Sequence, residues 1–256
     1  LLFLSSRITA QKFAYWGHGK NFQSSNHNSC AEKFKRFLSR RVDWWFAYNS
    51  LSSEIVKEMG YPPGMVTNVH NSVDTKKIKA LKESHTPKDL EELRSQLDLY
   101  SENVAVYTGG LSDIKRLDFL IRSAQLIRES VPDFELLLIG DGPNRESAKK
   151  ASEEYSWVRW LGKLNDEEKI GYWLLSKFIT MPGGVGLVVV DGLAASLPMV
   201  TTACPYHGPE IEYLQDGVNG IIVDAWESEQ DYADACVKLL SDEQYRLKLV
   251  EGCNVS

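Results

Sequence analysis

Segments with strand patterns and segments with helix patterns alternate along almost the whole chain. Short apolar runs predict strands at 12–16, 44–48, 66–69, 104–107, 134–139, 158–161, 178–181, 199–202 and 220–223. Amphipathic stretches predict helices at 28–41, 52–59, 117–131, 144–155, 167–175, 187–195, 209–214 and 230–240, and residues 1–7 have the pattern of a helix end. This alternation favours an α/β fold, in which helices connect parallel strands and cover both faces of the sheet.

The alternation is interrupted at 75–101, where the chain is polar and charged. Leu90, Leu93 and Leu97 recur there at helical spacing. We therefore expect a connector with a helix between one α/β segment at 1–74 and a second at 102–256. The length of 256 residues is compatible with about two domains.

The charge of the chain is unevenly placed. The net charge is −6, but residues 1–50 carry eight Lys and Arg against two acids. An acidic balance argues against a dedicated nucleic-acid-binding protein. The basic helix at 31–41 fits an anionic membrane surface, which salt-dependent attachment to anionic vesicles would test, and the alternative is a solvated helix face.

The cysteines and the apolar runs exclude other classes of protein. No apolar run reaches the roughly 18–20 residues that a membrane-spanning helix needs. The four cysteines, Cys30, Cys204, Cys236 and Cys253, are scattered and form no CxxC pair. They indicate reduced thiols in a cytoplasmic protein rather than a disulfide framework or a zinc site.

The most informative segment runs from Met181 to Thr202. A strand ends there, the glycines Gly183, Gly184 and Gly186 follow, and a helix opens near Leu187. The first N–H groups of a helix lack internal partners and attract anions such as phosphates. Asp191 lies about one turn into this helix, where its carboxylate could accept from ribose hydroxyls. The alternative is a tight turn whose glycines serve packing alone.

Three further glycine turns follow predicted strands. The first, Gly109-Gly110, leads to Lys115 and Arg116 at the start of a helix, where cations oppose the helix dipole. A bound diphosphate would explain this pair, and the alternative is a solvated basic pair. The other two turns span 140–143 and 160–163. Successive turns of this kind converge on one edge of a parallel sheet, outside the carboxyl ends of the strands.

Two histidines follow predicted strands. His18 lies between Gly17 and Gly19, where its imidazole could donate to a phosphate or sugar oxygen or serve a structural role. His207 has the pattern of a loop histidine. Glu210 opens a short helix, where a carboxylate is favoured by the helix dipole.

The order of these motifs resembles the retaining group 1 (family 4) glycosyltransferases, which have the GT-B fold. The resemblance rests on Gly17-His18-Gly19, Asn71-Ser72-Val73-Asp74, Gly109-Gly110, Lys115-Arg116, Gly140-Asp141-Gly142-Pro143, Trp160-Leu161-Gly162, the segment 182–201, Pro209-Glu210 and the segment 216–220. It implies two Rossmann-like domains: residues 1–74 as the incomplete back half of the acceptor-side domain, and 102–256 as the nucleotide-sugar domain. On this basis the chain is expected to be a fragment of a longer enzyme.

The resemblance also implies a set of site residues. His18 is expected to contact the donor near the reacting centre as the catalytic residue. The residues expected to bind the nucleotide sugar are Gly110, Lys115, Gly142, Gly162, Lys163, Gly183, Gly184, Val185, Gly186, Leu187 and Asp191. No metal and no cofactor are expected beyond the nucleoside diphosphate sugar itself. The chain departs from the family pattern in the side chains that contact the donor. Gly110 stands where the family has an arginine. Of the family's two glutamates, the first is replaced by Gly183 and the second by Asp191.

The implied activity is transfer of a sugar from a nucleoside diphosphate sugar to a hydroxyl with retention, in cell-envelope polysaccharide or glycolipid synthesis. Lipid-linked acceptors would bring the protein to the inner face of the membrane as a peripheral protein, without nucleic-acid partners. Two alternatives remain open. The first is a catalytically impaired partner subunit, to which Gly110 and Gly183 point, and the second is a nucleotide-sugar epimerase with the same fold.

Overall fold

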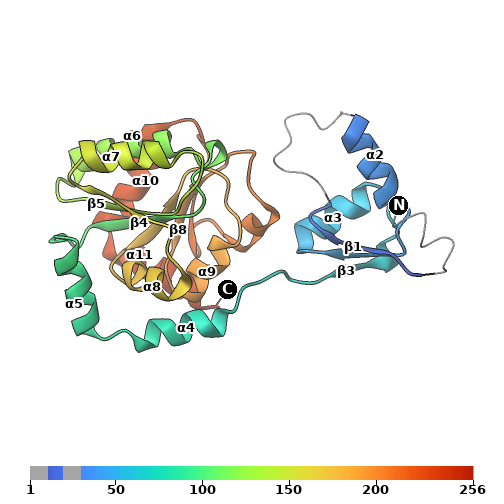
Figure 1. The fold of residues 1–256 in the computed structure, drawn as a ribbon, viewed down its shortest axis with the longest axis horizontal. Helices are drawn as coiled ribbons and strands as arrows, with labels where there is room; N and C mark the ends of the chain where they lie inside the picture. The colour runs from blue at the N-terminus through green and yellow to red at the C-terminus, as the bar shows by residue number, and fades with distance from the viewer. Residues whose placement is uncertain (1–10, 20–29, 256) are drawn as a thin grey trace. The chain divides into compact units, whose positions relative to one another are not determined.

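The computed structural model describes residues 11–19 and 30–255, which fall into two compact units that divide between Ser72 and Val73. Figure 1 shows the course of the chain through each unit. The predicted helix end at 1–7 lies outside the described residues. Within the described ranges, no helix is both long enough and apolar enough to cross a membrane.

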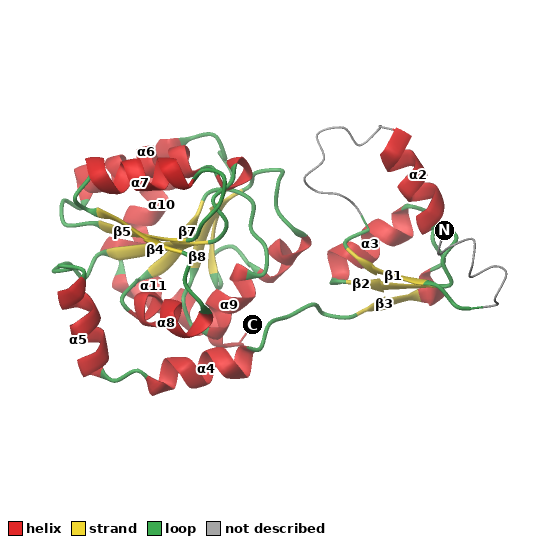
Figure 2. Ribbon diagram, in the orientation of Figure 1, coloured by secondary structure: helices red, strands yellow, loops and turns green. Residues whose placement is uncertain are grey.

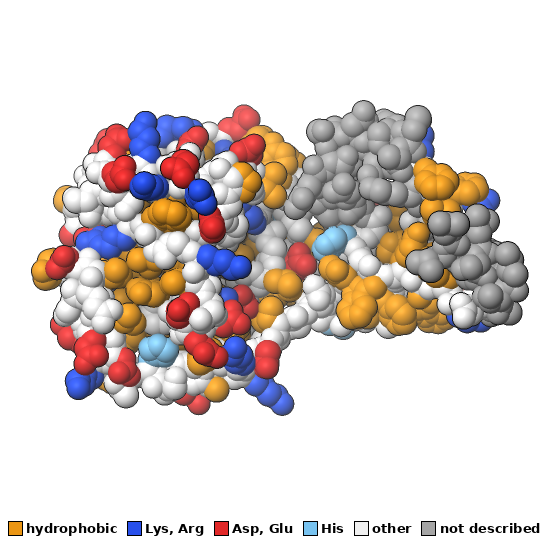
Figure 3. All heavy atoms as spheres, viewed as in Figure 1, with side chains coloured by type: hydrophobic (Ala, Val, Ile, Leu, Met, Phe, Trp, Pro, Cys, Tyr) orange, Lys and Arg blue, Asp and Glu red, His pale blue; other side chains and the backbone are white. Residues whose placement is uncertain are grey.

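The first unit contains a parallel sheet in the order β1-β2-β3. Its elements are β1 (Ala14–Gly17), α2 (Cys30–Ser39), β2 (Trp44–Ala47), α3 (Ser50–Glu58), a 3-10 turn (Pro63–Met65) and β3 (Val66–Asn68). A small core forms around Trp45, Val56 and Tyr61. Trp16, Trp44 and Phe46 are exposed, and hydrophobic side chains gather over the strands of this unit in Figure 3.

The second unit is built on a parallel sheet in the order β6-β5-β4-β7-β8-β9. The strands are β4 (Val104–Thr108), β5 (Glu135–Ile139), β6 (Val158–Gly162), β7 (Phe178–Met181), β8 (Met199–Thr202) and β9 (Gly220–Val223). The strand order reverses between β4 and β7, which are direct neighbours. In open sheets of this kind, such a switch point is where ligands bind, outside the carboxyl ends of the strands.

Helices cover both faces of the second sheet (Figure 2). Those of one layer are α6 (Leu117–Ser130), α7 (Arg145–Glu154) and α10 (Glu229–Ser241), and those of the other include α8 (Asp166–Leu174), α9 (Val188–Ala194) and α11 (Glu243–Val255). The strands read as continuous apolar runs because both faces are buried. The nine strands found in the described residues match those expected from the sequence to within two residues at either end, which confirms the α/β class.

The segment 75–101 forms two helices, where the sequence pattern indicated one. They are α4 (Thr75–Ser84) and α5 (Pro87–Gln96), and they pack against α8 and α9 of the second unit. The break falls where Thr86 and Asp89 form a capping box, in which each side chain accepts from the other's backbone N–H, with Pro87 at the first helical position. These signals start a new helix.

Two further elements differ from expectation. The predicted helix at 209–214 is a 3-10 segment, Pro209–Tyr213. Helix α11 was not predicted from its weak apolar periodicity. Gly252 in α11 packs directly against the backbone of Val218. A Cβ on Gly252 would overlap the carbonyl group of Val218 and lie 3.3 Å from the nitrogen of Asn219. Helix α11 therefore depends on tertiary packing more than on an amphipathic pattern.

Candidate functional site

The loops that follow four neighbouring strands are joined by backbone hydrogen bonds at the carboxyl edge of the second sheet. Leu111, after β4, donates to Asp141 after β5 at 3.0 Å, and Gly140 donates to Gly162 at the end of β6 at 2.7 Å. The loop after β7 is tied in as well, since its residues bond to the loops after β4 and β8. The glycine turns that the sequence singled out therefore form one cluster.

The close approach of these loops explains two of the glycines. A Cβ on Gly183 would lie 2.6 Å from the Cα of Lys115, against the backbone of the loop after β4. Gly142 has a φ of +159°, and a Cβ there would lie 2.8 Å from the nitrogen of Leu111. Any larger residue would push the loops apart, because backbone atoms cannot move aside as a flexible side chain can.

Lys115 lies at the centre of the cluster. It ends a 3-10 turn, Asp113–Lys115, and its Nζ donates to the carbonyl oxygen of Gly184 in the loop after β7. Burial lowers the pKa of Lys115, and the negative charge of Glu210, which is itself buried, acts in the opposite direction. The ammonium group is thus held where the loops after β4, β7 and β8 meet.

Arg116 has a role that the sequence did not indicate. Its backbone is left-handed, with φ 58° and ψ 47°. Its guanidinium donates to the carbonyl oxygens of Trp226 at 2.7 Å and Pro182 at 3.2 Å, and it lies 4.0 Å above the ring of Phe119. Arg116 therefore cross-links the protein itself and is not the solvated cation of the alternative interpretation, and its contact with a diphosphate stays a prediction.

The N–H groups of the loop before α9 divide into two sets. Gly184 donates to Ile114 at 2.8 Å, and Val185 donates to the Nδ1 of His207 at 3.1 Å. These two groups are occupied by contacts within the protein. The sequence pattern predicts that all the N–H groups of 183–187 are available to a ligand. In the structure, those of Gly184 and Val185 are already used within the protein.

The second set lies at the start of α9. The first bond of this helical turn runs from Val189 to the carbonyl of Gly186 at 3.2 Å. The N–H groups of Gly186, Leu187 and Val188 come before it, in the positions that have no partner within a helix. Together with the Lys115 ammonium they provide the kind of donors that bind a phosphate group.

His207 supports this loop as a neutral imidazole. Its Nδ1 accepts from Val185, so its Nε2 carries the proton and donates to the carbonyl of Thr202 at 2.6 Å. Burial lowers the pKa of His207, and the nearby charge of Lys115 acts in the same direction. The loop histidine expected from the sequence is thus a positioning group for the turn before α9.

Asp191 forms a buried ion pair. Its Oδ2 accepts from the Nζ of Lys169 in α8 at 3.1 Å, and Lys169 also contacts Asp166 at 2.9 Å. Burial raises the pKa of the Asp191 carboxyl, and the ammonium of Lys169 partly offsets this. Sequence reasoning missed Lys169, because nothing in the spacing of the two residues along the chain links them.

The remaining predicted donor residues lie around the cluster. Gly110 is exposed, and a Cβ there would meet only the carbonyl of Asp141, at 3.9 Å. Gly162 has a φ of +70° at the end of β6, and Lys163 is exposed beside it. Unlike Gly183, Gly110 leaves room for a side chain.

His18 lies in the first unit, directly after β1, while every predicted donor residue lies in the second. Its ring meets that of Tyr48 edge to face, with 4.3 Å between the ring centres. The catalytic role of His18 stays a prediction, and so does membrane contact by α2, on which Lys33, Phe34 and Phe37 are exposed.

Comparison with known proteins identifies the family of the chain. The family model of group 1 glycosyl transferases matches residues 102–242, which include every loop of the cluster. The chain belongs to this family. An uncharacterized glycosyltransferase of Methanocaldococcus jannaschii is 27% identical over 162 residues, which make up 60% of this chain and 44% of that protein. The alpha-monoglucosyldiacylglycerol synthase of Acholeplasma laidlawii is 27% identical over 150 residues, 55% of this chain and 36% of that protein.

The fold also matches solved structures. HepE of Anabaena, crystallised with UDP, has a TM-score of 0.78 at 20% identity, over 99% of this chain and 69% of HepE. The chain thus has the GT-B type of fold that the resemblance implied, and it spans less than half the length of the Methanocaldococcus relative.

Proposed function

We propose that this chain is part of a glycosyltransferase that binds a UDP-sugar at the carboxyl edge of the second sheet. The observation that carries the proposal is the hydrogen bond from Lys115 to the carbonyl of Gly184, which holds the ammonium in the same loop whose next N–H groups, those of Gly186, Leu187 and Val188, precede the first bond of α9. Relatives support the choice of base, since HepE was crystallised with UDP and with UDP-glucose.

The proposed reaction breaks the bond between the anomeric carbon of the sugar and the diphosphate oxygen. Negative charge grows on the leaving diphosphate, and the Lys115 ammonium and the start of α9 stabilise it. Asp191 accepts from the ribose hydroxyls through Oδ1, the oxygen that Lys169 does not contact. His18 orients the donor, and a hydroxyl of the acceptor adds to the anomeric carbon with retention while its proton passes to the leaving diphosphate.

A lipid-linked or membrane-bound acceptor is the further part of this proposal. The Acholeplasma relative is named as a synthase of a glucosylated diacylglycerol. Sugar transfer to such an acceptor for cell-envelope polysaccharide or glycolipid would place the protein at the cytoplasmic face of the membrane. The basic helix α2 and its exposed aromatic residues support this location.

A thermal-shift screen of the complete protein against UDP-, GDP- and ADP-sugars tests the donor assignment. We expect UDP-sugars to raise the melting temperature most, because a ligand that binds only the folded state stabilises it by mass action. A second candidate, a partner subunit without activity, is favoured by Gly183, where the packing leaves no room for the family's glutamate. That subunit would show no stabilisation by any nucleotide sugar, whereas binding followed by sugar transfer would exclude it.

A further inference from the structure

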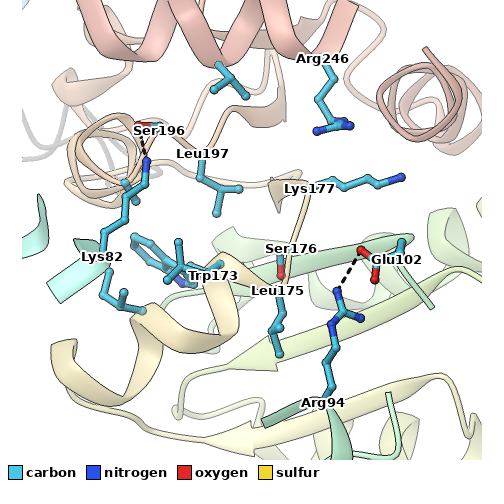
Figure 4. Close-up of a pocket in the computed structure, with 14 residues that line it drawn as sticks. Lys82, Arg94, Glu102, Trp173, Leu175, Ser176, Lys177, Ser196, Leu197 and Arg246 are labelled. Atoms are coloured by element: carbon cyan, nitrogen blue, oxygen red, sulfur yellow. Dashed lines mark hydrogen bonds and ion pairs between the residues drawn. The ribbon is translucent and has the colours of Figure 1, made fainter. Parts of the chain in front are cut away.

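A cavity of about 310 Å³ lies at the edge of the second sheet opposite the candidate site (Figure 4). Ser176 and Lys177 line it just before β7, and Leu197 lines it just before β8. Other lining residues come from α4, α5, α8 and α11, from Glu102 before β4, and from Ala195 and Ser196 after α9. Because these are the amino ends of the strands, the cavity is distinct from the loops that hold Lys115 and α9.

The lining of this cavity is strongly cationic. Four positive side chains come from four different parts of the chain: Lys82, Arg94, Lys177 and Arg246. The acid among the lining residues is Glu102, which pairs with Arg94 at 3.1 Å. Residues 51–256, in which the cavity lies, carry more acids than bases, so this concentration of positive charge runs against the balance around it.

Two of the four cations, Lys177 and Arg246, lie at one end of the cavity. Lys177 donates to the neutral side-chain oxygen of Asn103 at 2.8 Å. The Nε of Arg246 is buried and has no hydrogen-bond partner among the described residues, and its outer nitrogen reaches Glu243 only at 3.5 Å. Burial lowers the pKa of Lys177, the positive charge of Arg246 adds to this, and the carboxylates of Glu102, Asp133 and Glu243 act in the opposite direction. Lys177 and Arg246 thus lie close enough to repel each other, and an anion bound between them would relieve that repulsion.

The middle of the cavity is lined by apolar side chains, and a further lysine lies at the opposite end. Figure 4 shows Leu175 and Leu197 between the cations, with Lys82 on the far side. Lys82 donates to the hydroxyl of Ser196 at 2.7 Å and is a further donor for a polar group. A ligand that fits this arrangement has a strong anionic group at one end and an organic portion that packs against the leucines.

We infer that this cavity binds a phosphate ester, with the phosphate between Lys177 and Arg246 and the organic part against Leu175 and Leu197. A phosphate oxygen suits the arginine fork and the lysine ammonium better than a neutral group does. The site is separate from the donor site and does not depend on the proposed transfer reaction. A ligand here makes the second unit responsive to a phosphorylated compound, free or carried on a lipid headgroup.

The test uses the complete protein and glucose 1-phosphate as the probe, followed by calorimetry. We expect saturable binding to the unsubstituted protein and a loss of affinity of about tenfold or more in the double variant Lys177→Gln/Arg246→Gln, because charge-assisted hydrogen bonds to the phosphate are removed. The matched control is Lys149→Gln/Lys150→Gln, which removes the same charge from the exposed face of α7 and is expected to bind as the unsubstituted protein does. Lys177→Arg, which keeps the charge, is expected to retain binding.

Three outcomes would overturn the inference. One is no binding of glucose 1-phosphate to the unsubstituted protein, and another is equal binding by the Lys177→Gln/Arg246→Gln variant. The third outcome applies if the double variant does not fold. In that case the two single variants are compared, and the site is rejected if Lys177→Gln binds glucose 1-phosphate as tightly as Lys177→Arg does. Vesicles containing phosphatidic acid identify the source, since attachment that requires Lys177 and Arg246 assigns a lipid headgroup and soluble binding alone assigns a free ester. If UDP does not bind, the proposed donor site is rejected, but the expected difference in glucose 1-phosphate binding between the variants stays the same.

Discussion

Replacing Gly183 with Ala is expected to lower both the thermal stability of the protein and its affinity for UDP. The new Cβ would lie 2.6 Å from the Cα of Lys115, so the loops after β4 and β7 must separate. Overpacking of this kind costs about 1–3 kcal/mol, and each kcal/mol lowers the melting temperature of a domain of this size by about 2–4 °C. Separation of the loops also moves the Lys115 ammonium away from the start of α9.

The control for this prediction is Gly186→Ala, three residues further along the same loop. A Cβ on Gly186 would have no heavy atom within 4 Å. This variant is expected to keep the melting temperature of the unsubstituted protein, as measured by differential scanning calorimetry. A Gly183→Ala protein with unchanged melting temperature and unchanged UDP affinity would show that the loops are not packed as described.

Replacing Asp191 with Ala is expected to weaken UDP binding by about tenfold or more, because a hydrogen bond between a charged group and ribose is lost. The same change removes one of two carboxylates from Lys169, which is only 8% exposed. We therefore also expect a loss of stability of about 2 kcal/mol. Calorimetric titration and thermal unfolding measure the two effects separately.

The matched control for this prediction is Asp166→Ala, which removes the other partner of Lys169. Asp166 is half exposed and begins α8, after the loop that follows β6. Its removal is expected to cost less than about 1 kcal/mol and to leave UDP affinity unchanged. Equal UDP affinity in the Asp191→Ala and Asp166→Ala proteins would reject the role of Asp191 at the ribose and leave it as a structural partner of Lys169.

The two departures from the family pattern differ in their physical consequences. Gly110 has room for a side chain, because the nearest atom to a Cβ is the carbonyl oxygen of Asp141 at 3.9 Å. Gly183 has none, because the backbone of Ile114 and Lys115 fills the space. The absence of the glutamate is therefore built into the packing of the loops, while the absence of the arginine is not.

Local signals explain why the strands and the loop cluster could be predicted. Strands such as β5 are short apolar runs closed by glycines, and parallel pairing then places the following loops at one edge. The break between α4 and α5 also has a local signal, because Thr86, Pro87 and Asp89 form a pattern typical of a helix N-terminus. The prediction of a single helix followed the leucine spacing and did not use this pattern.

Contacts between distant parts of the chain could not be predicted in this way. The partner of Asp191 is Lys169 in a different helix, and Arg116 bonds to Trp226, 110 residues further along. His207 accepts a hydrogen bond from the N–H of Val185, and no local sequence pattern indicates this contact. Such pairs are fixed by how helices and loops pack on the sheet, and a single sequence carries no periodic signal for them.

A crystal structure of the complete protein with UDP is the most direct test of the central claim. We predict that the diphosphate lies within hydrogen-bond distance of the Lys115 ammonium and of the N–H groups of Gly186, Leu187 and Val188, with the ribose hydroxyls at Asp191. A diphosphate bound anywhere else on the protein, or loops at 109–116 and 182–188 that make no contact with it, would contradict the account.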